Sequence, residues 1–106
     1  MQRITGRGIG AAHVFSCIGL LYHRQNRIRE AINMFDAAIE IYAHYRRNDE
    51  AAPVYASLGK VYFDSGDLNL AEVTLSKALE MYSLRKGSQE AIDTISNLLD
   101  LISERR

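Results

Sequence analysis

The chain has 106 residues, of which 47% are hydrophobic, and its 13 basic and 13 acidic side chains give a net charge of zero. This length suits one small domain, and the charge balance excludes a globally basic surface, so we expect neither nucleic acid nor a membrane as a partner. The single cysteine, Cys17, excludes an internal disulfide framework and favours a reducing compartment, which predicts a cytoplasmic protein.

The N-terminal segment 1–10 contains three glycines but lacks the preceding strand and the lysine ending of a phosphate-binding loop. We expect it to be a flexible tail. The mostly apolar run 9–22 is similar to a secretory signal, but His13 interrupts it and its apolar residues match positions further along the chain. A cleaved leader has no reason to match the core, so we interpret 11–24 as a helix of the fold.

The chain resembles itself at a shift of 40 residues. The residues that recur identically are Ala12, Val14, Gly19, Tyr22, Ala31, Ala38, Glu40 and Tyr42, which return as Ala52, Val54, Gly59, Tyr62, Ala71, Ala78, Glu80 and Tyr82. Units of such an array bury their apolar faces by stacking on one another, so the self-match predicts a solenoid.

Five helices are expected in chain order. The segments 11–24 and 50–64 open the two repeats, and 28–42 and 68–82 follow them with apolar residues at every third or fourth position. The last segment, 89–105, begins like another first helix. Because the connection inside each repeat is short, its two helices should be antiparallel neighbours.

Glycine and asparagine occupy matching places in the two repeats. Gly19 and Gly59 lie in mid-helix, where each costs roughly 1 kcal/mol relative to alanine, so another helix should pack closely there. Asn26 and Gly66 lie in the short connections, and both residue types tolerate the left-handed backbone that ends a helix. The residues expected to cap helix N-termini are Asp49, Asp67 and Ser88.

The recurring residues match a known pattern of aromatic, aliphatic, glycine and tyrosine positions followed by a small, a large and a small residue. They are Phe15, Ile18, Gly19, Tyr22, Ala31, Phe35 and Ala38 in the first repeat, and Tyr55, Leu58, Gly59, Tyr62, Ala71, Leu75 and Ala78 in the second. Over about 12–102 the chain thus resembles the tetratricopeptide repeat family. The 40-residue period is similar to the long-repeat branch found in kinesin light chains and spindle-orientation adaptors.

This resemblance implies an all-α fold, an α-solenoid of antiparallel helical hairpins. It contains two tetratricopeptide units, about 11–48 and 50–87, and a C-terminal capping or half-repeat helix, 89–105. The relatives are protein-binding scaffolds, so we expect no enzymatic activity, no cofactor and a protein or peptide ligand.

In the family, the exposed sides of the first helices form a concave ligand-binding face. The resemblance places on it His13, Ser16, Leu20, His23, Arg24, Ala56, Lys60, Phe63, Asp64, Asp93, Ser96, Asp100 and Glu104. Leu20 and Phe63 are the strongest candidates, because they are large apolar side chains that the packing pattern does not bury. The charges predict a groove that runs from basic to acidic, and hence a peptide with apolar anchors and the opposite charge order.

Relatives that bind chaperone tails hold a terminal carboxylate with lysine and asparagine side chains. The corresponding positions here hold Ser16, Leu20, Ala56 and Ser96. We therefore predict that this carboxylate clamp is absent.

The final helix raises an alternative function. Leu98 and Leu101 correspond to Leu58 and Val61, which we expect to pack on the second helix of their own repeat, and no second helix follows 89–105. The helix is then a cap, part of a longer array, or covered by another copy. The last outcome predicts a structural or self-assembly module that forms a homodimer through Leu98 and Leu101.

The residues that catalysis or metal binding would need are dispersed. His13 and His23 are too far apart in sequence for metal-ligand spacing, and His44 falls on a different helix. Cys17 lies between packing positions, so we expect it to be a small buried residue. The sequence predicts neither a catalytic nor a metal site.

Overall fold

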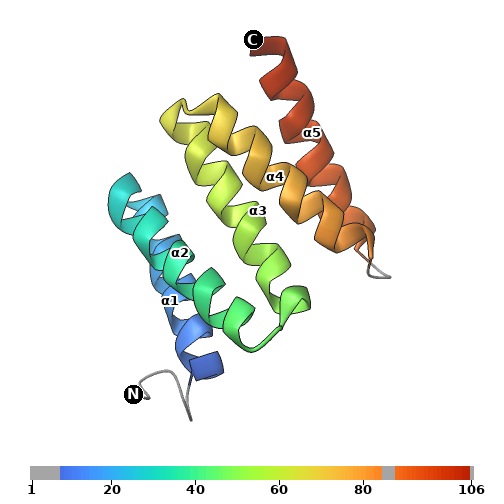
Figure 1. The fold of residues 1–106 in the computed structure, drawn as a ribbon. Coiled ribbons are helices and arrows are strands. Elements are labelled where there is room, and N and C mark those ends of the chain that lie inside the picture. Colours follow the sequence, from blue (N-terminus) through green and yellow to red (C-terminus); the bar gives the residue numbers. More distant parts are fainter. Residues whose placement is uncertain (1–7, 85–87, 106) are drawn as a thin grey trace.

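The computed structural model describes residues 8–84 and 88–105, and this part of the chain forms five helices and no strand. The helices are α1 (Gly8–Arg24), α2 (Ile28–His44), α3 (Asn48–Ser65), α4 (Leu68–Ser83) and α5 (Gln89–Arg105). Consecutive helices are antiparallel and lie side by side, from α1 at one end of the array to α5 at the other (Figure 1). The predicted all-α solenoid is confirmed.

The first helix starts earlier than the sequence indicated. It begins at Gly8, so 8–10 are helical rather than part of a flexible tail, and Gly8 is buried. The remainder of the expected tail, 1–7, lies outside the described residues. The other helices begin and end within two residues of the predicted bounds.

The core consists of two apolar clusters that share α3. The first cluster joins α3 to α1 and α2, and it includes Leu58 and Val61. The second joins α3 to α4 and α5, and it includes Ala52. The expectation that Leu58 and Val61 pack on their own second helix is therefore wrong, because they belong to the cluster formed with the preceding repeat. One side of α3 is thus buried against α1 and α2, and another side is buried against α4 and α5.

Tyr62 packs against both clusters and thus connects the two hairpins. Burial is the main cause that raises the pKa of its hydroxyl above the usual value, and the negative charges of Asp36 and Asp67 add to the effect.

The mid-helix glycines lie beneath large side chains, as predicted. A Cβ atom on Gly59 would lie 2.6 Å from both Cγ and Cδ2 of Leu75, and one on Gly19 would lie 2.9 Å from Cε1 of Phe35. Phe35 and Leu75 are fully buried. The missing side chains of α1 and α3 therefore admit the largest fully buried side chains of α2 and α4.

The turns combine correct and incorrect expectations. Asn26 and Gly66 have φ angles of 63° and 92°, which confirms their left-handed backbone, and Arg46 unexpectedly has one of 57°.

Of the three residues expected to cap helix N-termini, Asp67 caps α4, because its carboxylate accepts a hydrogen bond from the Leu70 N–H at 3.2 Å. Asp49 does not cap α3, which begins one residue earlier, at Asn48. Ser88 directly precedes α5, and its backbone carbonyl accepts from the Ile92 N–H at 2.9 Å.

We expect Gly59→Ala to destabilise the fold by about 1–2 kcal/mol, because the overlap with Leu75 outweighs the higher helix propensity of alanine. Gly10→Ala is the matched control, since a Cβ atom there meets nothing within 4 Å. Urea unfolding followed by circular dichroism measures both changes. An unfolding free energy for Gly59→Ala equal to or above that of the unsubstituted chain would contradict the close packing.

Arg46→Gly should raise the unfolding free energy by up to about 1 kcal/mol, because glycine relieves the left-handed strain but adds freedom to the unfolded chain. Gly66→Ala should lower it by about 1 kcal/mol for the converse reason. Thermal unfolding of the two variants checks whether they shift the transition in opposite directions.

Candidate functional site

A groove lies between the two first helices. Its lining comes in equal parts from α1 and α3, and its volume is about 450 Å³. The lining residues are Leu20, His23 and Arg24 from α1, and Ser57, Lys60 and Asp64 from α3. All but Ser57 belong to the predicted concave face, so the fold brings residues that are far apart in sequence to one hollow.

Helical spacing explains why these side chains converge. Residues three or four positions apart share one face of a helix, and the lining residues of each helix have this spacing. Leu20 and Lys60 also occupy the same position in the two repeats, as do Arg24 and Asp64. The two walls of the groove are therefore the equivalent faces of α1 and α3, but they carry different side chains.

Leu20 supplies the apolar part of the groove. Leu20 is 44% exposed, which confirms that the packing of the helices does not bury it. Arg24 and Lys60 are exposed in the same hollow and bring positive charge beside it. An apolar side chain that shares a groove with two cations suits a ligand that carries an apolar group next to an acidic one.

A hydrogen bond between His23 and Asp64 joins the two helices that line the groove. His23 Nε2 lies 2.7 Å from Asp64 Oδ2, so the pair joins α1 to α3 across the repeat boundary. The His23 side chain is 17% exposed and that of Asp64 is 43% exposed. Because water reaches the pair, we expect it to stabilise the fold by about 1 kcal/mol or less. The same contact gives Asp64, the acidic residue of the groove, a hydrogen-bond partner.

Several predicted ligand-facing residues do not line this groove. Phe63 is only partly exposed: it packs against the second core cluster, and the Arg105 guanidinium carbon lies 4.5 Å from its ring centroid. The expectation of an open Phe63 ring is thus wrong, because α5 covers it. Ser16 is half-buried on α1.

The acidic residues of α5 also lie apart from the groove. Asp93 and Asp100 are exposed, and the Gln89 side-chain amide donates to Asp93 Oδ1 at 2.9 Å. Sequence reasoning missed Ser57, which lines the groove one turn before Lys60. The spacing of three residues from Lys60 could have identified it.

The final helix buries a different side from the one its repeat position implies. Ile95 and Ile102 are its fully buried residues, and they correspond to Tyr55 and Tyr62 rather than to Val54 and Val61. Leu98 packs partly against the second cluster. Leu101 is 42% exposed. Self-association through these two leucines stays a prediction, with Leu101 as its accessible member.

Cys17 is exposed, so the expectation that it is buried is wrong. Its Sγ lies 3.7 Å from His13 Nε2, and His13 is exposed as well. The equivalent residue in α3, Ser57, is half-buried and lines the groove, so α1 and α3 differ on this side of the helix. No described helix covers this side of α1, because α1 lies at the end of the array (Figure 1).

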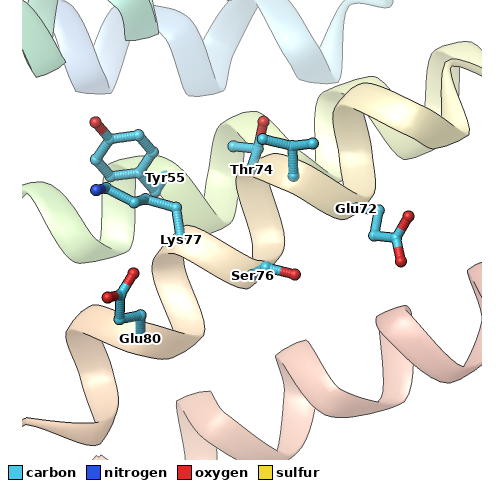
Figure 2. Close-up of a pocket in the computed structure, with 7 residues that line it drawn as sticks. Tyr55, Glu72, Thr74, Ser76, Lys77 and Glu80 are labelled. Carbon is cyan, nitrogen blue, oxygen red and sulfur yellow. The ribbon is translucent and has the colours of Figure 1, made fainter.

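A second hollow of about 590 Å³ lies over α4 and has Tyr55 of α3 at its edge. Lys77 extends toward the Tyr55 ring with Glu80 near it, whereas Ser76 and Glu72 point to the other side of α4 (Figure 2). The sequence analysis predicted no site here. The lining carries both charge signs and includes Val73, which is 66% exposed, but all of it except Tyr55 comes from one helix, whereas the groove lies between two helices.

The described residues, 8–84 and 88–105, contain no group of three or more histidine, cysteine, aspartate or glutamate side chains that could hold a metal ion. Among the helices that the structure describes, none has the length and apolar character needed to cross a membrane.

A family profile described as the tetratricopeptide repeat matches residues 10–83. The chain belongs to the tetratricopeptide repeat family. No curated protein matches the chain. Tetratricopeptide repeats generally mediate interactions between proteins and are typically not catalytic. The helical hairpins described above are the units of this family, and the groove lies between the first helices of its two repeats.

We expect Cys17 to react with a maleimide in the folded protein at the rate of an exposed thiol, because its side chain meets solvent. Mass spectrometry of samples quenched over time gives the rate, and the same reaction in urea supplies the rate for a fully open thiol. Labelling that is slower by a hundredfold or more in the folded protein would restore the buried interpretation.

Proposed function

We propose that this tetratricopeptide repeat domain is a non-catalytic scaffold that binds a peptide segment of a protein partner in the groove between α1 and α3. One observation carries the proposal. Leu20, His23, Arg24, Lys60 and Asp64, which the family resemblance assigned to the ligand-facing side, line a single hollow that extends across both repeats.

The chemistry of the groove defines the ligand. Leu20 offers an open apolar contact, and Arg24 and Lys60 offer positive charge in the same groove. Arg24 and Lys60 outnumber Asp64, whose carboxylate accepts a hydrogen bond from His23, so the net charge of the groove is positive. A peptide with a large apolar side chain adjacent to aspartate or glutamate complements this surface.

The direction of a longer ligand follows from the charges beyond the groove. Asp93 and Asp100 are exposed on α5, and Glu104 is exposed one turn further along the helix. A ligand that extends over α3 toward α5 would therefore carry its acidic residues at the α1 end and its basic residues at the α5 end.

The ligand is an internal segment rather than a chain terminus. The positions where relatives hold a terminal carboxylate are Ser16, Leu20, Ala56 and Ser96, and none of these side chains is cationic. We further infer a cytoplasmic adaptor of the long-repeat branch, on the basis of the 40-residue period and the single exposed thiol.

Selection of a random dodecapeptide library displayed on phage against the immobilised chain tests the proposal. We expect the enriched peptides to share an apolar residue next to an acidic one. Synthetic versions should bind at least tenfold more weakly to Leu20→Asp and to Lys60→Glu, because the first removes the apolar contact and the second reverses the charge. Isothermal titration calorimetry measures the affinities.

Val73→Asp is the matched control, since Val73 is an exposed apolar residue on α4, outside the groove. It should leave the affinity unchanged. Enriched peptides that bind the Leu20→Asp variant as tightly as the unsubstituted chain, or that lose affinity with Val73→Asp instead, would place the ligand elsewhere and overturn the proposal.

A further inference from the structure

The outer side of α1 is an apolar stripe that no described residue covers. Val14, Cys17 and Leu21 follow one another at three- and four-residue spacing, so they share one side of the helix. Val14 is 53% exposed, Leu21 is 52% exposed, and Cys17 is exposed between them. Ile18 borders the stripe and is half-buried. We call Val14, Cys17 and Leu21 the outer stripe of α1.

The second repeat shows what such a stripe does when a neighbour is present. The positions in α3 that correspond to Val14 and Leu21 are Val54 and Val61, which are 3% and 0% exposed. They belong to the core cluster formed with α2, which is antiparallel to α3. The two ends of the stripe are thus buried against an antiparallel helix in one repeat and open in the other, whereas the counterpart of Cys17 is Ser57, which lines the groove.

We propose that the outer stripe of α1 is a homodimer interface, in which α1 of a second copy packs antiparallel on it about a two-fold axis. The stripe carries no charged residue, so it is complementary to itself. The other end of the array does not match it, because the outward residues of α5 are largely polar or acidic: Glu90, Asp93, Asn97, Asp100 and Glu104. A head-to-tail contact would bury those charges, whereas a two-fold contact buries none.

The spacing of the stripe defines the contact pairs. The midpoint between Val14 and Leu21 falls between Cys17 and Ile18, so an antiparallel two-fold axis passes beside Cys17. Val14 then contacts Leu21 of the second copy, and the two Cys17 side chains approach each other across the axis. A parallel arrangement would instead pair each residue with its own equivalent.

This two-fold axis also preserves the concave side. The axis lies in the plane of the interface and is perpendicular to α1, so both copies direct the groove between α1 and α3 to the same side of the dimer. The dimer therefore places two grooves next to each other on one continuous surface. Two weak sites on one particle raise the avidity for a partner with repeated motifs.

The interface is a single helix face, and such small contacts bind weakly, with dissociation constants of about micromolar or higher. Sedimentation equilibrium of the full chain from about 10 µM to 1 mM should therefore show a reversible monomer–dimer equilibrium. Val14→Lys should weaken the dimer at least tenfold, because it buries an unpaired charge, and should leave the unfolding free energy unchanged. Val73→Lys, on exposed α4 surface, is the control for added charge.

Disulfide formation tests the geometry independently of stability. Copper phenanthroline with dissolved oxygen should convert the Cys17 thiols to a covalent dimer faster than it does Cys17→Ser/Ser76→Cys, whose cysteine lies on exposed α4 surface. In the Cys17→Ser background, Val14→Cys mixed with Leu21→Cys should cross-link faster than either alone, since equivalent residues lie about 10 Å apart along the helix axis, beyond disulfide reach.

A monomer at every concentration, or cross-linking of Cys17 no faster than that of the cysteine at position 76, would overturn the proposal. It would also be overturned if Val14→Cys cross-linked best with itself, which indicates a parallel contact, or if Leu101→Glu abolished the dimer while Val14→Lys did not. None of these outcomes bears on peptide binding in the groove, because Leu20 and Lys60 lie outside the outer stripe.

Discussion

The structure depends on the burial of α3 from two sides. In α3, Leu58 and Val61 pack toward α2, while Gly59 admits the Leu75 side chain of α4. Only the third side of the helix is then left to solvent, and it faces the concave surface. The groove beside Leu20 and Lys60 is therefore a consequence of packing that occupies the other two sides. Substitutions at the buried positions would alter the groove through the spacing of the helices.

The two ends of the array meet this constraint differently. At the C-terminal end, α5 buries Ile95 and Ile102, and its side chains toward solvent are largely polar. Position 99 holds leucine where the full repeats have glycine, so α5 lacks the gap that admits a large side chain from a following helix. Leu99 packs partly against the second cluster instead. The exposed side of α5 is thus largely polar, whereas the outer stripe of α1 is apolar and open.

The electrostatics of the groove come from the contact between repeats. His23 holds Asp64 in a hydrogen bond, so the acidic side chain that opposes Arg24 and Lys60 has a partner from α1. The same pair links α1 to α3, so it contributes both to the relative position of the repeats and to the charge that a ligand meets. If two copies associate through α1, these positive regions lie on one surface and favour a partner with more than one acidic segment.

Local pattern was sufficient to predict the helices, the two glycine contacts and the left-handed turns at Asn26 and Gly66. Each depends on neighbours in sequence and on a period that the chain repeats. The family resemblance also identified most of the groove, because it assigned equivalent positions of the two first helices to the same face. It could not show that Cys17 is exposed, that α5 covers Phe63, or that His23 meets Asp64. Periodicity states which side of a helix a residue occupies, but only the packing of the other helices decides whether that side is covered.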